Sequence, residues 1–163
     1  LIYLPYLMGE RTPHLNPNCR GVFFGLSAIH TKADMLRAVM EGVSYSLLDC
    51  FDILREMKVN VKEMMACGGG GKSRVWRQML ADMYGCEVKT IKAQEGPALG
   101  VAILAGVGAG IFPDVQTACK EFIEQDTWCQ PDAAAHAYYE KGHALYQKLY
   151  QKLKDCYEDL AAL

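Results

Sequence analysis

The sequence has little net charge and no uninterrupted long apolar run, and both deficits restrict what the chain can bind. Its 17 basic and 19 acidic residues give a net charge of −2. Nucleic acids and anionic membranes attract proteins through an excess of positive charge, so we expect neither as a partner. Residues Gly96 to Pro113 carry no charge, but Pro97, Gly106 and Gly110 interrupt them. We expect a buried helix there, because the continuous apolar part is too short to cross a bilayer.

Clustered metal ligands and paired cysteines are missing as well. The seven cysteines include no Cys-x-x-Cys pair, and the four histidines are scattered along the chain. A structural zinc site needs such ligands close together, so no residue is predicted to bind a metal. Cysteines spread in this way indicate reduced thiols in the core of a cytoplasmic protein.

The chain also lacks an initial methionine and a signal-peptide pattern. It begins with Leu1-Ile2-Tyr3 inside an apolar stretch, which leads us to expect a fragment of a longer protein. The 163 residues, 51% hydrophobic and 22% charged, are enough for one globular domain with a core of its own.

Strand and helix signals alternate along the chain and predict an α/β class with a partly parallel sheet. Strands are expected at 1–8, 20–27, 63–67 and 86–91, and helices at 31–57, 74–84, 95–110, 114–124 and 132–160. Thr31 and Asp34 form a variant capping box at the start of the first long helix, and Asp114 and Asp132 are expected to cap the last two helices. Residues 127–131 are expected to be irregular.

Apolar residues at helical spacing predict which face of each long helix is buried. The predicted stripe of the first helix contains Leu36, Val39, Met40, Val43, Leu47, Phe51 and Leu54. That of the last helix contains Tyr138, Leu145, Leu149, Leu153, Cys156 and Leu160. The helix after residue 95 is apolar all round and is expected to be buried on most sides.

Four consecutive glycines, Gly68 to Gly71, follow a weak strand and precede a strong helix. This arrangement suits nucleotides, because a glycine turn exposes backbone N–H groups and a helix start adds partial positive charge. Packing alone could explain one or two of the glycines, but each costs about 0.5–1 kcal/mol relative to alanine in an ordered element. Four in a row therefore favour a binding role.

Two familiar nucleotide motifs fit this segment poorly. Gly71-Lys72-Ser73 supplies the end of a P-loop, but Ala66 replaces its first glycine and the preceding strand is weakly apolar. The next strand also lacks a terminal aspartate for Mg²⁺. A Rossmann fingerprint would need an acidic residue ending a strand about 20 residues later, and none is present.

Three separated segments resemble the C-terminal half of the FGGY carbohydrate kinases. Gly21-Val22-Phe23-Phe24-Gly25-Leu26, followed after seven residues by 34–41, is similar to the family's C-terminal signature. Residues 68–73 with 76–82 resemble its adenosine motif, and 95–100 resemble the helix start that follows. Residues 4–7 and 9–14 are similar to the branch that acts on xylulose.

The resemblance implies a ribonuclease-H-like, actin-like ATPase lobe, incomplete at its N-terminal end, with residues 1–163 as the C-terminal domain of a two-lobed enzyme. Gly69, Gly70 and Ser73 would border the adenosine and α-phosphate of ATP, while Gly68 and Gly71 would shape the turn. Mg²⁺, the sugar and the catalytic aspartate would be held mainly by the other lobe, so no catalytic or metal-binding residue is expected here.

The implied reaction is transfer of the ATP γ-phosphate to D-xylulose, giving xylulose 5-phosphate and ADP. Another sugar or polyol (ribulose, gluconate or glycerol) and a non-catalytic actin-like nucleotide-binding module are the alternatives. The isolated chain is expected to be inactive, and a homodimer is left open.

Several other polar residues have both a functional and a structural interpretation. Glu10 and Arg11 form either a contact with the rest of the enzyme or an exposed ion pair. His14 is expected at the surface of its loop, and Trp76 in the core rather than stacked on adenine. Asp82 is expected to be solvated or to cap a neighbouring element.

Overall fold

The computed structural model describes residues 1–92 and 96–163 and divides the chain into two compact units. The first contains 1–61, 82–85 and 131–163, and the second contains 62–81 and 86–130. Each unit has a sheet of its own, so the units are described separately. Glu95, which the sequence places at a helix start, lies outside the described residues.

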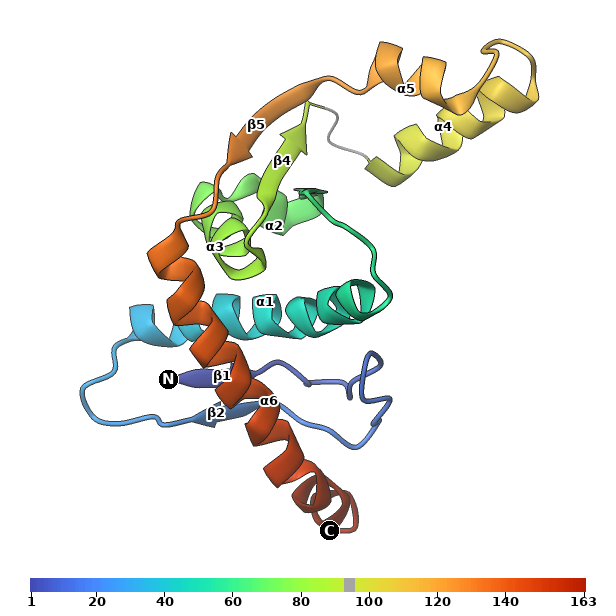
Figure 1. Ribbon diagram of the computed structural model, residues 1–163. Helices are drawn as coiled ribbons and strands as arrows, with labels where there is room; N and C mark the ends of the chain where they lie inside the picture. The colour runs from blue at the N-terminus through green and yellow to red at the C-terminus, as the bar shows by residue number, and fades with distance from the viewer. Residues whose placement is uncertain (93–95) are drawn as a thin grey trace. The chain divides into compact units, whose positions relative to one another are not determined.

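The first unit packs a two-stranded sheet against two long helices (Figure 1). Strands β1 (Ile2–Leu4) and β2 (Val22–Phe24) pair antiparallel, and helices α1 (Lys32–Glu56) and α6 (Ala133–Ala161) accompany them. Gly42 lets α1 approach β1, because a Cβ at this position would collide with the carbonyl oxygen of Tyr3. The core of this unit therefore lies where α1 meets β1 and α6.

The helix starts are set by side-chain caps, as the sequence predicts. Asp34 Oδ2 accepts from the Thr31 backbone N–H at 2.7 Å, and Thr31 Oγ1 accepts from the Asp34 N–H, which completes the capping box of α1. Asp132 caps α6 by accepting from the Ala135 N–H at 2.8 Å. These bonds satisfy amide groups that have no partner within the helix.

The predicted buried faces of both long helices are wrong in part. Leu36, Leu47 and Leu54 are exposed, and α1 instead buries a face that combines aromatic, small and polar residues. That face contains Ala38, Gly42, Ser44, Tyr45, Leu48, Asp49 and Phe51. The buried face of α6 contains Tyr139, His143, Tyr146, Leu149, Tyr150 and Tyr157, whereas Tyr138, Leu145 and Leu160 are exposed. Four of the six buried residues of α6 are tyrosines, so a pattern based mainly on aliphatic residues misplaces the core.

The second unit contains a three-stranded sheet in the order β3-β4-β5. Strand β3 (Glu63–Met65) runs parallel to β4 (Glu87–Ile91), and β5 (Gln125–Cys129) pairs antiparallel with β4. The segment 127–131, expected to be irregular, thus mostly belongs to a strand. Thr127 and Trp128 favour a strand, but Gln125 and Asp126 do not, so the local signal is weak and pairing with β4 decides the outcome.

The second unit also contains α2 (Gly68–Lys72), α4 (Gly96–Gly108), α5 (Val115–Phe122) and most of α3 (Arg74–Tyr84). Residues Asp82–Gly85, at the end of α3, belong to the first unit. The core of the second unit contains Ala81, Val88 and Cys129, with Met64, Ala66 and Leu80 packed against them. Asp114 caps α5, as expected, by accepting from the Thr117 N–H at 2.6 Å.

Helix α4 is more exposed than its composition suggests. Only Ile103 and Gly106 are buried among its described residues, while Val101 and Leu104 are more than half exposed. Gly106 lies against the Phe112 ring, with 2.9 Å between an added Cβ and the nearest ring atom. The prediction of a helix buried on most sides is therefore wrong for this chain.

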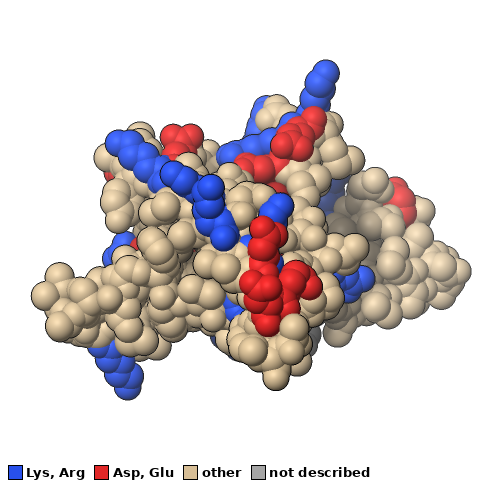
Figure 2. Space-filling model, turned by 90° about the horizontal axis from the view of Figure 1, so that it is seen from below, with Lys and Arg blue, Asp and Glu red and all other residues tan. Residues whose placement is uncertain are grey.

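Charged and uncharged side chains are mixed over the surface. Figure 2 shows basic and acidic groups together with broad uncharged areas on one face, in keeping with the net charge of −2. Within residues 1–92 and 96–163, no helix has both the length and the apolar character required to cross a membrane.

Candidate functional site

A pocket of about 410 Å³ lies at the carboxyl ends of the two parallel strands of the second unit. The segment after β3, helices α2 and α3, and strands β4 and β5 all contribute to its lining, together with the residue that follows β4. These residues are Ala66, Cys67, Gly68, Gly71, Lys72, Arg77, Thr90, Ile91, Lys92 and Asp126. In α/β proteins ligands bind outside the carboxyl ends of the strands, so this position favours a binding site.

The four glycines form a short helix, α2, rather than the expected turn. At three of these positions, the backbone conformation or a close contact within the unit disfavours any larger residue. Gly68 has a φ of +72°, a Cβ on Gly71 would lie 2.8 Å from the carbonyl oxygen of Ala66, and Gly70 lies beneath the Trp76 ring. Gly69 differs, because its φ is outside the positive range that favours glycine and a Cβ there would have no described neighbour within 4 Å. Packing thus explains Gly70 and Gly71, and backbone conformation explains Gly68, but neither explains Gly69.

Ser73 connects α2 to the following helix. Its hydroxyl accepts from the Trp76 N–H at 3.3 Å, and its own N–H donates to the Gly70 carbonyl oxygen at 3.2 Å. Ser73 therefore accepts from one of the N–H groups at the start of α3 that have no partner within the helix. Among the predicted nucleotide-binding residues, Gly68 and Gly71 line the pocket, whereas Gly69, Gly70 and Ser73 are on the same segment outside the described lining.

Arg77 is the buried cation of this site, with 9% of its surface exposed. Its Nη1 donates to the carbonyl oxygen of Gly71 at 2.5 Å, and its Nε has no hydrogen-bond partner in the described part of the chain. Lys72 and Lys92 add two further positive charges, against the single carboxylate of Asp126. The lining is thus net positive and suits an anionic ligand.

Two threonines hold the strand end that forms the pocket wall. Thr90 Oγ1 lies 2.6 Å from Thr127 Oγ1 and accepts from the Thr127 N–H at 3.1 Å, which joins β4 to β5. Lys92 forms an ion pair with Glu124, which raises the pKa of the Lys92 ammonium. These contacts keep Thr90 and Lys92 beside Asp126 at one end of the sheet.

Comparison with known proteins gives this pocket a family context. The family model described as the FGGY family of carbohydrate kinases, C-terminal domain, matches residues 1–109. The chain belongs to the FGGY carbohydrate kinase family. Xylulose kinase of Staphylococcus epidermidis is 40% identical to it over 163 residues, which are 100% of this chain and 33% of that protein. The chain therefore spans about a third of the length of the curated relatives that it matches.

Solved structures agree with this assignment. A ligand-bound xylulose kinase from Lactobacillus acidophilus matches with a TM-score of 0.87 and 33% identity over 98% of this chain and 32% of that one. Gluconate kinase from the same organism matches with a TM-score of 0.88, 33% identity and the same coverage. The FGGY chain described here thus has the actin-like, ribonuclease-H-like fold of these sugar kinases.

The lining residues of this FGGY chain that were not predicted include the polar side chains of Arg77, Thr90, Lys92 and Asp126. Arg77 comes from α3, directly after the glycine segment, whereas the other three reach the glycines only because β4 and β5 pair beside β3. The basic side chains near the glycine segment were the available signal, but Lys92 and Asp126 are separated by 33 residues that include two helices. Sequence proximity could not bring them together.

The other polar candidates have structural partners in the first unit. Glu10 accepts from the N–H groups of Thr12 and His14, both at 2.7 Å, and thereby shapes its own loop. His14 is half-buried and stacks on Tyr150, with 3.4 Å between ring centroids, so the expectation of a surface residue is wrong. Asp82 caps a neighbouring element, as one of its two interpretations proposed, because its Oδ1 accepts from the Asp132 N–H at 2.9 Å.

Proposed function

We propose that residues 1–163 form the C-terminal, ATP-binding domain of a kinase that converts D-xylulose and ATP into xylulose 5-phosphate and ADP. The observation that carries this proposal is the net-positive pocket beside the glycine segment at the parallel strand ends, in a chain of the FGGY family. Relatives named xylulose kinase support the choice of sugar.

In this proposal the glycine segment binds the adenosine end of ATP. Gly69 offers backbone without a side chain or a described neighbour, so the adenosine and α-phosphate can approach it closely. Gly68 and Gly71 line the pocket, Gly70 and Ser73 belong to the same segment, and the three cations of the lining attract the phosphates. Orientation of ATP against the sugar would then come from closure with the remainder of the enzyme.

Magnesium fits the pocket less well than ATP does. Mg²⁺ takes several oxygen ligands in a strict octahedron, and the described lining contains one carboxylate, Asp126. We therefore assign Mg²⁺, the sugar and the catalytic base to the part of the enzyme outside these 163 residues, and we assign no catalytic residue within them. A cytoplasmic location and a homodimer belong to the same proposal.

A kinase assay on the intact protein tests the sugar and the nucleotide together. We expect ADP formation with D-xylulose at a kcat/KM at least tenfold above that with gluconate, ribulose or glycerol. Gluconate is the second candidate because a gluconate kinase matches this chain with a TM-score of 0.88. A preference for gluconate would change the substrate but keep the kinase, whereas nucleotide binding without transfer to any sugar would favour a non-catalytic actin-like module.

The isolated chain provides the test of the two-lobed arrangement. Residues 1–163 alone should show no phosphoryl transfer from ATP to D-xylulose, because they supply neither the sugar site nor the base. Clear turnover by this chain would contradict the assignment of catalysis to the other lobe.

A further inference from the structure

A second pocket, of about 460 Å³, lies within the first unit and has no role in the proposed kinase reaction. His14 lines it from the β1–β2 connection, Asp49 and Glu56 from α1, and Gln147 and Lys148 from α6. Both helices begin with side-chain caps. The lining side chains indicate which chemical group the pocket can bind.

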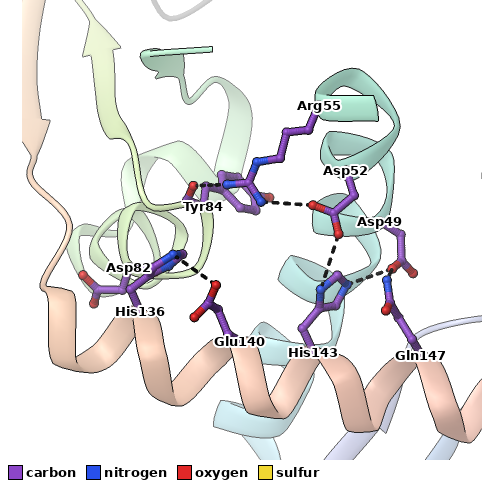
Figure 3. A network of polar contacts seen from close by, with 9 residues as sticks. All are labelled: Asp49, Asp52, Arg55, Asp82, Tyr84, His136, Glu140, His143 and Gln147. Atoms are coloured by element: carbon purple, nitrogen blue, oxygen red, sulfur yellow. Dashed lines mark hydrogen bonds and ion pairs between the residues drawn. The ribbon is translucent and has the colours of Figure 1, made fainter. Parts of the chain in front are cut away.

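Asp49 is the buried anchor of this pocket, with 4% of its surface exposed. Its Oδ1 accepts from His143 Nε2 and from Gln147 Nε2, each at 2.8 Å (Figure 3). Its Oδ2 is buried and has no hydrogen-bond donor in the described part of the chain. A buried carboxylate oxygen without a donor is costly, so this atom indicates a missing N–H or O–H group.

His14, which lines the same pocket, carries a second unpartnered atom. Its Nε2 is buried without a partner among the described residues, while the ring is held by stacking on Tyr150. Burial lowers the pKa of His14, despite the opposing charges of Glu10 and Asp49, so the neutral ring is favoured. A neutral imidazole has one nitrogen that accepts hydrogen bonds, which suits a ligand that donates several.

The carboxylates along α1 determine the spacing and the sign of the charges in the pocket. Asp49 and Glu56 are seven residues apart on α1, a rise of about 10 Å, with Ile53 on the lining between them. Asp52 also lines the pocket but is already engaged by Arg55 at 3.0 Å and by His143 Nδ1 at 3.7 Å. Lys148 is the single Lys or Arg side chain in the described lining. The α1 side of the pocket thus carries three carboxylates, with Ile53 as its apolar residue between Asp49 and Glu56.

We propose that this pocket binds a linear aliphatic diamine or polyamine. One ammonium group donates to Asp49 Oδ2 and to His14 Nε2, the methylene chain lies along Ile53, and the second ammonium group faces Glu56. A metal ion is the weaker alternative, because the described residues include no cluster of three His, Cys, Asp or Glu side chains able to hold one. The proposal stands apart from the assignment of the glycine segment to ATP.

Calorimetric titration of the intact protein at constant ionic strength tests the ligand class. Putrescine and spermidine should bind saturably with one site per chain. Butylamine should bind at least tenfold more weakly, because it lacks the group that faces Glu56, and 1,4-butanediol should not bind. No saturable binding of either polyamine, or equal binding of the uncharged diol, would overturn the proposal.

Three variants separate this pocket from general attraction of amines to acidic surfaces. Asp49→Asn should weaken putrescine binding at least tenfold, and Lys148→Ala should strengthen it severalfold by removing a competing cation. The control is Asp155→Asn, an exposed carboxylate on the same helix as Lys148, which should leave the affinity unchanged.

Exposed positions keep the test valid if Asp49→Asn does not fold. Glu56 and Lys148 are both exposed, so Glu56→Gln and Lys148→Ala should fold normally and shift the affinity in opposite directions. If Glu56→Gln and Lys148→Ala change the affinity no more than Asp155→Asn does, amines do not occupy this pocket and the proposal is wrong.

Discussion

The Arg77 side chain turns back along its own helix and donates from Nη1 to the carbonyl oxygen of Gly71 at 2.5 Å. This bond joins α3 to the C-terminal end of α2 and places a buried guanidinium in the wall of the glycine pocket. The same side chain therefore supports the glycine segment and contributes charge to the site. Stability and nucleotide binding should respond together when it is replaced.

Arg77→Met keeps an unbranched side chain, although a shorter one, and removes every donor. The Gly71 carbonyl then loses its partner, which should lower the free energy of unfolding by about 1–3 kcal/mol. The KM for ATP should rise while the KM for the sugar changes little. Urea denaturation and steady-state kinetics on the intact enzyme measure both effects, with exposed Arg74→Met as the control on the same helix. An unchanged KM for ATP in a folded Arg77→Met enzyme would exclude a role in nucleotide binding.

Gly69 should show opposite effects on stability and on binding. Its position is helical and open, so Gly69→Ala should stabilise the fold by up to about 0.5–1 kcal/mol. The same methyl group, and more strongly the side chain of Gly69→Val, should raise the KM for ATP far more than the KM for the sugar. Equal changes in the two KM values would mean that the glycine serves packing only.

Gly71 provides the matched comparison for Gly69. A Cβ at Gly71 would lie 2.8 Å from the backbone oxygen of Ala66, so Gly71→Ala should destabilise the fold by about 1–3 kcal/mol. Thermal or urea unfolding of the two alanine variants should therefore shift in opposite directions. Destabilisation by Gly69→Ala as large as that by Gly71→Ala would contradict the open space assigned to Gly69.

All the helices of this protein except α2 could be located from local signals, while the buried faces of α1 and α6 and the full pocket could not. Thr31 with Asp34, Asp114 and Asp132 mark helix starts through bonds to residues three positions away, and such bonds depend on nearby sequence alone. The α1 stripe failed because Leu36 and Leu47 fit the helical period but face away from the partners that α1 meets, namely β1 and α6. Gly68 and Gly71 were found as lining residues, whereas Thr90 and Asp126 join them only through strand pairing.

The capping box of α1 should make stability depend on pH in the acid range. Bonds from Thr31 lower the pKa of Asp34 below its usual value of 3.8, so its carboxylate stabilises the fold above that pH. As the pH falls through the lowered pKa, the carboxylate is protonated and this contribution is lost. The melting temperature of the wild type should exceed that of Asp34→Asn at pH 7, and the gap should close as the pH falls below 3.8 and through the lowered pKa. A gap that stays constant over this range would show that the charge of Asp34 is not involved.

Gly142 permits the closest contact between α6 and α1, because a Cβ there would collide with the hydroxyl of Tyr45. Tyr45 is 2% exposed and packs among Tyr139, His143 and Tyr146, so its ring has little room to move. Gly142→Ala should therefore lower the free energy of unfolding by about 1–3 kcal/mol, as overpacking of a core usually does. Tyr45→Phe removes the colliding oxygen, so the double variant should recover part of this loss in a double-mutant cycle. If the changes in unfolding free energy of Gly142→Ala and Tyr45→Phe simply add in the double variant, the strain does not come from this contact. Only a direct contact between the two residues lets Tyr45→Phe reduce the cost of Gly142→Ala.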